Sequence, residues 1–263
     1  MPFHARIARD AAVPMDAPDH HPGVVCGRIE GGKFVTPAGG VFRLDEVRFL
    51  PPVCPSKIVC VGRNYAEHAR ELGNEVPAEP LLFLKPPSSL NGHGGTVVRP
   101  RSVQKLSYEG ELALVVGRRA RRLSEAEAWS AVAGFTVLND ITARDWQKKD
   151  GQWTRAKGSD TFCPVGPCWV PKEQVAFEQL RIISRVNGQV RQDASVTGMI
   201  FGVPQLIAFI TAFMTLEPGD LIATGTPPGV GAVEPGDIVE VEIPGIGRLE
   251  NRIAGDTDPA EKV

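Results

Sequence analysis

Three carboxylates in the middle of the 263-residue chain have the types and spacing of a metal site. Glu109 and Glu111 are two residues apart and precede an apolar run over 112–116. Residues two apart in a β-strand share a face, so both carboxylates would occupy one site, with Gly110 leaving the opposite face bare. Each carboxylate raises the pKa of the other unless a cation neutralises the pair. Two exposed glutamates at the start of a strand would show the same spacing.

A third carboxylate favours the metal interpretation. Asp140 follows the apolar run 134–139, where a strand would deliver its side chain into a cleft. It would also suit the cap of a helix that begins near Thr142. Three hard oxygen ligands without a nearby His or Cys favour Mg²⁺ or Mn²⁺ over zinc and leave positions for water and substrate. The sequence therefore predicts a divalent metal site on Glu109, Glu111 and Asp140.

His68 and Glu71 are a second pair with catalytic potential. Their i, i+3 spacing places them on one face of a helix, where they can touch. A carboxylate that orients a histidine makes it a competent general base for a water molecule. A salt bridge on an exposed helix would have the same spacing, and the sequence leaves both interpretations open.

Several polar side chains could bind an anionic substrate, although each singly would also suit a solvated surface: Arg63, Tyr65, Lys85, Gln147 and Lys157. The glycine-rich segment 224–231 follows a predicted strand and permits a close approach of the backbone to a ligand. It matches neither the P-loop nor the dinucleotide fingerprint, so nucleotide binding is not supported.

The elements that must position these residues are mostly strands. Helices are predicted over 64–72, capped by Asn64, over 126–133, opened by the Ser124–Glu127 capping box, from near Thr142, and over 204–214. Strands are predicted over 24–29, 33–35, 57–61, 112–116, 135–138, 181–186, 221–224 and 238–243. Without a regular β-α-β alternation, this indicates an α+β protein with a mixed or antiparallel sheet.

Proline and glycine divide the chain. Residues 1–22 lack apolar periodicity and are predicted to form an irregular lead-in. The cluster Pro51-Pro52-Val53-Cys54-Pro55 breaks any regular element. We therefore expect a small β-rich N-terminal region over 1–52 and a catalytic domain over 53–263.

The composition argues against several classes of protein. The net charge of −2 does not suit a surface built for nucleic acid. The arginine cluster 118–122 is interpreted as a solvated loop, with a non-catalytic polyanion-binding protein as the alternative from another class. No apolar stretch reaches about 18 residues and no signal segment is evident, so we expect a cytoplasmic protein without a membrane partner. The five scattered cysteines are predicted to be reduced and mostly buried.

Six motifs, in the same order along the chain, resemble the fumarylacetoacetate hydrolase family over roughly 56–247. They are Gly62-Arg-Asn-Tyr-Ala-Glu-His68, Phe83-Leu-Lys-Pro86, Tyr108-Glu-Gly-Glu-Leu-Ala113, Asn139-Asp-Ile-Thr-Ala-Arg-Asp145, Lys157-Gly-Ser-Asp-Thr-Phe-Cys-Pro164 and Thr224-Gly-Thr-Pro-Pro-Gly229. The additional upstream aspartate of the founding hydrolases has no matching motif here. The site should therefore follow the members with three carboxylates.

The resemblance implies a β-rich roll of stacked mixed sheets with few short helices, usually as a homodimer. It implies Mg²⁺ or Mn²⁺ on Glu109, Glu111 and Asp140. His68 and Glu71 match the His-x-x-Glu pair of members that cleave acylpyruvates or decarboxylate oxaloacetate, on a segment that closes over the ligand. Lys157 joins them as a catalytic residue. The positions at which such relatives contact substrate or metal-bound water correspond to Arg63, Tyr65, Lys85, Gln147 and Thr226.

The expected function is that of a metal-dependent enzyme acting on small 2-oxo acids through a metal-bound enolate. It would cleave a C–C bond as an acylpyruvate hydrolase, an oxaloacetate decarboxylase or both. The family's isomerases of 2-hydroxyhepta-2,4-diene-1,7-dioate and 5-carboxymethyl-2-hydroxymuconate offer an alternative, because one enolate site serves all three reactions.

Overall fold

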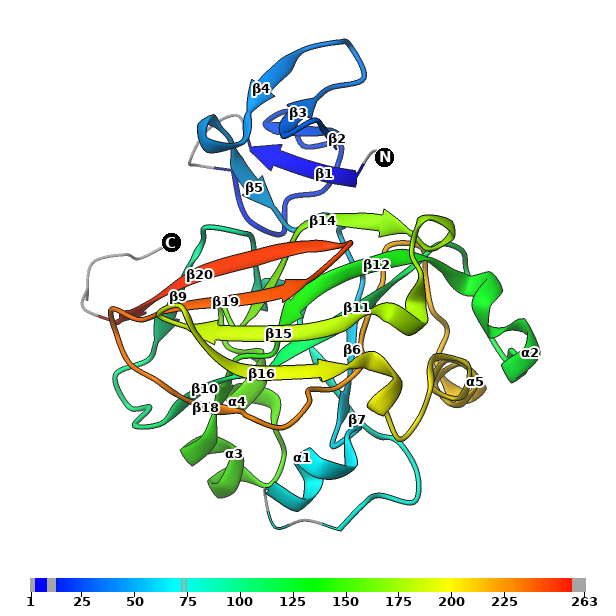
Figure 1. The fold of residues 1–263 in the computed structure, drawn as a ribbon, viewed down its shortest axis with the longest axis vertical. Coiled ribbons are helices and arrows are strands. Elements are labelled where there is room, and N and C mark those ends of the chain that lie inside the picture. The colour runs from blue at the N-terminus through cyan, green and yellow to red at the C-terminus, as the bar shows by residue number, and fades with distance from the viewer. Residues whose placement is uncertain (1–2, 9–12, 72, 74, 257–263) are drawn as a thin grey trace.

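The computed structural model describes residues 3–8, 13–71, 73 and 75–256. A 12-stranded sheet runs through the molecule in the order β4-β3-β2-β1-β14-β12-β11-β17-β6-β7, with β5 on β1 and β8 on β14. Its first strands form the upper part of Figure 1. They are β1 (Phe3–Ala8), β2 (Val24–Glu30), β3 (Lys33–Val35), β4 (Val41–Arg43) and β5 (Arg48–Leu50).

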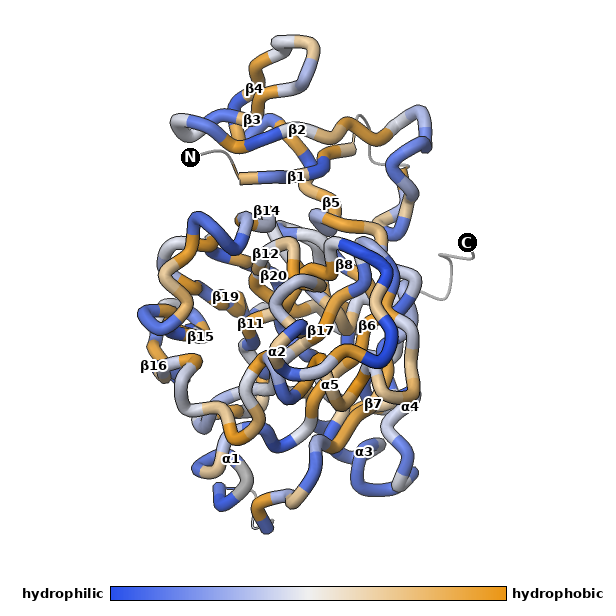
Figure 2. Tube along the Cα trace, turned by 90° about the vertical axis from the view of Figure 1, so that its right-hand side faces the viewer, coloured by the Kyte–Doolittle hydropathy of each residue, from blue (hydrophilic) through white to orange (hydrophobic). Residues whose placement is uncertain are grey.

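The remaining strands of this sheet run through the body of the protein. They are β6 (Ile58–Gly62), β7 (Leu81–Lys85), β8 (Leu90–Asn91), β11 (Gly110–Val116), β12 (Val132–Asn139), β14 (Cys163–Pro171) and β17 (Leu221–Ala223). Every residue of β11 is buried, because both faces of this strand are covered. Figure 2 shows hydrophobic residues along β6 and β17 in the interior.

Two smaller sheets complete the fold. A five-stranded sheet has the order β16 (Gln189–Ser195), β15 (Arg181–Val186), β19 (Ile238–Ile243), β20 (Gly247–Gly255) and β9 (Thr96–Arg99). It stacks on the 12-stranded sheet, since Val241 and Ile243 share a core with Leu112 and Leu114. A three-stranded sheet joins β13 (Thr142–Ala143), β10 (Leu106–Tyr108) and β18 (Gly231–Val233).

The predicted α+β class with mixed sheets is confirmed. Most strand pairs are antiparallel, but β17 runs parallel to β6, β14 to β8 and β20 to β9. The helices are few and short, as the sequence indicates: α1 (Ala66–Glu71), α2 (Glu125–Ala128), α3 (Arg144–Asp150), α4 (Thr154–Gly158) and α5 (Val203–Phe213).

Two helix predictions need correction at their ends. The first helix begins at Ala66, because the Asn64 side chain does not cap it and instead bonds Phe201 and Thr224. The capping box of α2 is present, but the helix ends at Ala128, and residues 132–133 belong to β12. Strand pairing with β11 and β14 outweighs the local helix signal there.

The prediction of an irregular lead-in is wrong for 3–8, which form β1. This strand pairs with β2 over its whole length and with β14 at His4 and Ala5. Both partners lie outside residues 1–22, β2 directly after this segment and β14 far along the chain, so a local reading of residues 1–22 could not find them. The proposed boundary near residue 52 lies in the connection between β5 and β6, and a separate domain over 1–52 stays a prediction.

Other global expectations concern cysteines and membranes. Within the described residues the five cysteines are free thiols, with Cys60, Cys163 and Cys168 buried and Cys26 and Cys54 exposed. No helix in the described ranges is long and apolar enough to cross a membrane.

Candidate active site

The chain changes sheet at the first of the three carboxylates. Glu109 lies between β10 of the three-stranded sheet and β11 of the 12-stranded sheet, so the expected single strand is interrupted there. Its amide donates to Asn139 Oδ1 at 3.0 Å, and its carbonyl accepts from the amide of Asp140 at 2.8 Å. Because Gly110 pairs with Asn139, the two strand ends that carry Glu109 and Asp140 lie side by side.

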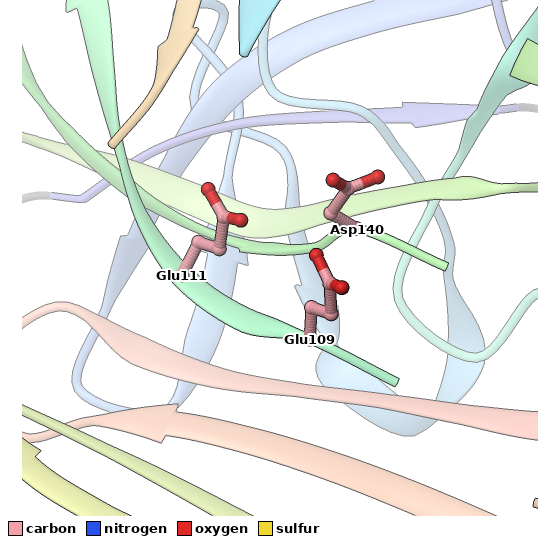
Figure 3. A group of neighbouring side chains, drawn as sticks. All are labelled: Glu109, Glu111 and Asp140. Atoms are coloured by element: carbon pink, nitrogen blue, oxygen red, sulfur yellow. The ribbon is translucent and has the colours of Figure 1, made fainter. Parts of the chain in front are cut away.

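The three predicted ligands converge, as Figure 3 shows. One carboxylate oxygen from each of Glu109, Glu111 and Asp140 lies within 4.8 Å of the other two, and all three residues are buried. Asp140 directly follows β12, as the sequence predicts. Three buried carboxylates so close together suit a hard divalent cation, which accepts oxygen ligands.

The opposite side of Gly110 is packed and not bare, which corrects the sequence interpretation. A Cβ atom at this position would lie 2.2 Å from Ser184 Oγ and 3.1 Å from Gln192 Oε1. The amide of Gly110 donates to Gln192 Oε1 at 3.0 Å. Glycine is therefore required because the five-stranded sheet approaches the backbone between the two glutamates.

Two of the three carboxylates are paired with cations. Lys157 Nζ lies 3.0 Å from Glu109 Oε2 and 2.5 Å from Asp140 Oδ2, and Lys85 Nζ also contacts Asp140. Arg144 binds the other oxygen of Glu109. Burial would raise the pKa of Glu109, but Lys157 and Arg144 hold it well below its usual range. Burial would lower the pKa of Lys157, but Asp140 and Glu109 raise it, so the ammonium stays charged.

Glu111 has a different environment. Its side chain is 1% exposed and accepts a hydrogen bond from the Gly225 amide at 2.8 Å. Among the residues that the structure describes, no cationic side chain pairs with it. Burial first, and then the charges of Asp140 and Glu109, raise the pKa of Glu111 well above its usual range. The residues therefore fit a divalent cation, because the cluster keeps one buried carboxylate without a countercharge.

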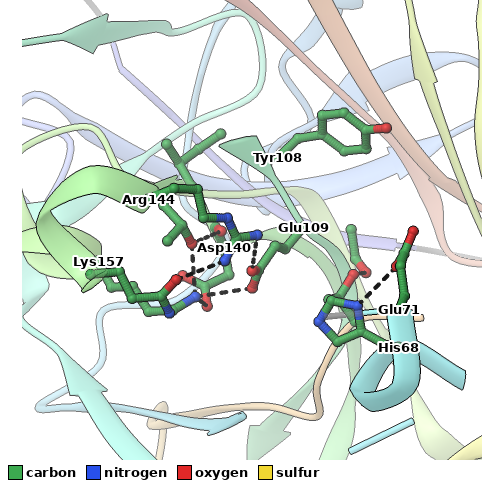
Figure 4. Close-up of polar contacts among 12 residues, drawn as sticks. His68, Glu71, Tyr108, Glu109, Asp140, Arg144 and Lys157 are labelled. Carbon is green, nitrogen blue, oxygen red and sulfur yellow. Dashed lines mark hydrogen bonds and ion pairs between the residues drawn. The ribbon is translucent and has the colours of Figure 1, made fainter. Parts of the chain in front are cut away.

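The predicted pair on α1 is formed. His68 Nδ1 lies 3.3 Å from Glu71 Oε2 (Figure 4). His68 is 3% exposed, which speaks against a salt bridge on the surface of an exposed helix. Burial lowers the pKa of His68, although Glu109 and Glu71 oppose this effect. The imidazole is therefore mainly neutral near pH 7 and can accept a proton.

A cavity of about 470 Å³ is lined by Glu109, Glu111 and His68, and Asp140 is not among its lining residues. Four further residues predicted from the sequence line it: Arg63, Gln147, Lys157 and Thr226. Tyr65 and Lys85 are not among its lining residues. Lys85 contacts Asp140 instead, and the Tyr65 hydroxyl has no hydrogen-bond partner among the described residues. Their contact with substrate stays a prediction.

The cavity also contains residues that the sequence interpretation did not single out. Phe83 and Trp153 form an apolar wall, and Arg144 and Lys148 add positive charge. A signal for Arg144 was available, because it precedes Gln147 by three residues and bonds its Oε1 at 3.0 Å on α3. Phe83 stands in the quoted motif Phe83-Leu-Lys-Pro86, whereas Trp153 and Lys148 carry no such local signal.

The arginine cluster 118–122 lies in the loop between β11 and α2. Arg118 Nε donates to the Ser130 carbonyl at 3.0 Å, Arg119 pairs with Glu217 at 3.2 Å, and Arg121 donates to the Thr211 carbonyl at 2.7 Å. These contacts give three of the four arginines a role within the protein.

Comparisons with known proteins identify relatives of this chain. The family model described as fumarylacetoacetate (FAA) hydrolase C-terminal matches residues 57–254. The oxaloacetate tautomerase YisK of Bacillus subtilis is 44% identical over an alignment of 226 residues, and the match covers 81% of this chain and 75% of that protein.

Similar solved structures include two enzymes. The 2-hydroxyhepta-2,4-diene-1,7-dioate isomerase from Mycobacterium marinum has a TM-score of 0.84 and 40% identity, covering 98% of this chain and 100% of that chain. The fumarylpyruvate hydrolase from Pseudomonas aeruginosa, in complex with Mn²⁺ and pyruvate, has a TM-score of 0.72 and 34% identity, covering 78% and 91%.

Proposed function

The chain belongs to the fumarylacetoacetate hydrolase family, and on this premise we propose that it is a metal-dependent enzyme that moves a proton beside the keto group of a small 2-oxo dicarboxylate. The observation that carries the proposal is one cavity lined by a buried, mainly neutral histidine, His68, and by two carboxylates of the acidic cluster. Keto–enol exchange of a compound such as oxaloacetate needs this combination of a base and a stabilised enol oxygen.

The acidic cluster would hold the cofactor. A divalent cation on Glu109, Glu111 and Asp140, Mg²⁺ or Mn²⁺, would bind the 2-oxo acid unit and stabilise negative charge that develops on its keto oxygen. Lys157, which lies between Glu109 and Asp140, keeps these carboxylates oriented and charged.

His68 supplies the proton transfer. Its Nδ1 faces Glu71, so this nitrogen carries the proton and Nε2 is free to accept one (Figure 4). In the proposed keto-to-enol direction the C3–H bond breaks, its proton goes to Nε2, its electron pair becomes the C2=C3 double bond, and the C=O π pair moves to the keto oxygen. Transfer of the proton from Nε2 to that oxygen completes the enol and restores the neutral imidazole, so no external reactant is consumed.

The charge of the cavity favours a dianionic substrate. Arg63 and Lys148 line it, and neither has an ion-pair partner in the ranges that the structure describes. The cation would bind one carboxylate and the keto group of the substrate, and Arg63 and Lys148 would then be able to bind the second carboxylate of the substrate. Phe83 and Trp153 limit the width of the cavity.

Cleavage of a C–C bond is the second candidate. The contact of 3.3 Å between His68 and Glu71 would equally serve to activate a water molecule against the distal carbonyl of an acylpyruvate. Loss of CO₂ from oxaloacetate would need no nucleophile, only the same stabilised enol. The relatives named above include a hydrolase, a tautomerase and an isomerase.

The test measures the activity of the purified protein with Mn²⁺ or Mg²⁺ on three compounds: oxaloacetate, an acylpyruvate and a 2-hydroxydienoate. Each assay is run with and without chelator. We expect chelator-sensitive loss of the enol of oxaloacetate without release of CO₂. Pyruvate with CO₂, or pyruvate with a free acid from the acylpyruvate, would assign the second candidate. Inactivity on all three compounds with the metal present would refute the proposal.

A variant pair assigns the role of the histidine. His68→Ala should lose about 10²–10⁴-fold in kcat, the usual contribution of a general base, and should still bind Mn²⁺ and oxalate. The matched control is His20→Ala, an exposed histidine in the N-terminal part of the chain, which should retain full activity. Loss of metal in His68→Ala would show that the ligands are misassigned.

A further inference from the structure

The hydroxyl of Tyr108 lies next to the loop that follows β17. Tyr108 pairs with Gly231 across β10 and β18, which brings the loop 224–230 against its ring. Its hydroxyl donates to the carbonyl of Gly229 at 2.6 Å. Burial raises the pKa of Tyr108 to about 12, so the phenol remains protonated and able to donate.

Gly229 also contacts the catalytic pair. Its amide lies 3.1 Å from both Oε1 and Oε2 of Glu71, which in turn lies 3.3 Å from His68 Nδ1. A single residue of the loop therefore accepts a hydrogen bond from Tyr108 and donates one to Glu71. Hydrogen bonds therefore run from Tyr108, next to the proposed ligand Glu109, through Gly229 and Glu71 to the proposed base.

The loop has little freedom at this point. Gly229 has φ +98°, and a Cβ atom there would lie 2.1 Å from the Arg191 carbonyl. Gln192 holds the preceding residues, since its Nε2 donates to Thr226 Oγ1 and to the Pro227 carbonyl, both at 2.8 Å. The same Gln192 accepts a hydrogen bond from the amide of Gly110, so it ties the loop to the backbone between the two glutamates.

The helix α1 depends on such anchors. It has six residues, and a helix of this length is not stable without tertiary contacts. The contact of Glu71 with the Gly229 amide ties the end of α1 to the loop. Movement of the loop would therefore move Glu71, and with it the orientation of the His68 ring.

We propose that Tyr108 is a positioning residue for His68, acting through Gly229 and Glu71. The inference rests on the proposed function only in taking His68 as the base. Without the Tyr108 hydroxyl, the Gly229 carbonyl loses its donor, and the loop no longer presents its amide to Glu71 at a fixed place.

The test is a double-mutant cycle with Tyr108→Phe and Glu71→Ala. Tyr108→Phe should lower kcat about three- to tenfold, the size expected for one hydrogen bond, with KM and Mn²⁺ affinity changed less than about twofold. In the Glu71→Ala background the same substitution should have no further effect on kcat. An equal loss in both backgrounds would overturn the proposal, because Tyr108 would then act by another route.

A second measurement does not depend on turnover. Hydrogen–deuterium exchange should be faster in α1 and at the Gly229 amide in Tyr108→Phe than in the wild-type protein, with β11 unchanged. The matched control is Thr136→Val, which removes another buried hydroxyl, bonded to the Cys168 carbonyl at 2.7 Å. It should leave exchange in α1 unchanged.

The two measurements separate the inference from the proposed function. If the wild-type protein acts on no 2-oxo acid, the proposed function fails, and exchange in α1 alone decides whether Tyr108 positions this helix. Unchanged exchange in α1 of Tyr108→Phe would overturn the positioning role, whatever the substrate.

Discussion

The two glutamates of the acidic cluster should respond in opposite ways to the same substitution. In the metal-free protein, Glu109→Gln would leave Arg144 without an ion pair among the described residues and would leave Lys157 with Asp140 as its one remaining carboxylate partner. Glu111→Gln would break no ion pair with a described residue, and its amide oxygen could still accept from Gly225. It would also replace a buried carboxyl whose ionised form is disfavoured by burial and by the charges of Asp140 and Glu109. We therefore expect Glu109→Gln to destabilise the metal-free protein and Glu111→Gln to leave it equally stable or more stable.

The expected changes in the free energy of unfolding and in Tm follow from these contacts. Removing one partner of a buried ion pair costs about 3–5 kcal/mol. For a chain of this size 1 kcal/mol corresponds to about 2–4 °C in Tm, so Glu109→Gln should lower Tm by about 6–20 °C. A cation at about 100 times its Kd stabilises the native state by about 2.7 kcal/mol, which adds about 5–11 °C to the wild-type protein. Both variants should lose most of this rise in Tm on metal binding.

The assay is thermal unfolding at pH 7 of three proteins, with chelator and with a titration of Mn²⁺. The expected order of Tm in chelator is Glu111→Gln at or above wild type, and Glu109→Gln clearly below it. In saturating Mn²⁺ the wild-type protein should be the most stable. Equal destabilisation of both variants in chelator would refute the reasoning, because it would mean that Glu111 is also paired with a cation.

Three further predictions test other parts of the site. Activity should fall as the pH falls through the pKa of His68, which burial places below the 6.5 of free histidine. In Glu71→Gln, the acidic limb of the plot of kcat/KM against pH should lie at still lower pH, because Glu71 raises the pKa of His68. A limb that moves to higher pH would contradict this assignment. Gly110→Ala should cost about 1–3 kcal/mol by chemical denaturation, because the new Cβ would lie 2.2 Å from Ser184 Oγ, and adding Ser184→Ala should recover part of it. Arg63→Ala should raise KM for a 2-oxo dicarboxylate about tenfold and leave KM for a 2-oxo monocarboxylate nearly unchanged; equal changes for both substrates would argue against a role in binding the second carboxylate.

Local patterns and the family resemblance together predicted that the three carboxylates converge and that His68 contacts Glu71. The spacing of Glu109 and Glu111 and the place of Asp140 after a strand favoured a shared site, although the same patterns also suited exposed glutamates and a helix cap. The i, i+3 spacing likewise predicted the contact between His68 and Glu71. Such patterns span a few residues, over which backbone periodicity determines the direction of a side chain.

Local sequence patterns could not predict contacts between distant segments of the chain. No local signal shows that β1 pairs with β14, which begins 160 residues later in the chain, or that Ala133 belongs to a strand and not to a helix. The strand break at Glu109 arises because the chain passes there from one sheet to another. These features depend on which strands become neighbours, and that choice is made by packing across the whole molecule.

The sequence by itself determined the kinds of groups at the site: three hard oxygen ligands, a histidine with its carboxylate, and an excess of cations for an anionic substrate. Only the tertiary structure decided how these charges are divided, with Lys157 and Arg144 on Glu109 and without a cation from the described residues on Glu111. It alone also placed the Tyr108 hydroxyl against Gly229, 121 positions away. The physical reason is that side-chain chemistry belongs to each residue, whereas electrostatic and hydrogen-bond partners depend on distances that only the packed sheets establish.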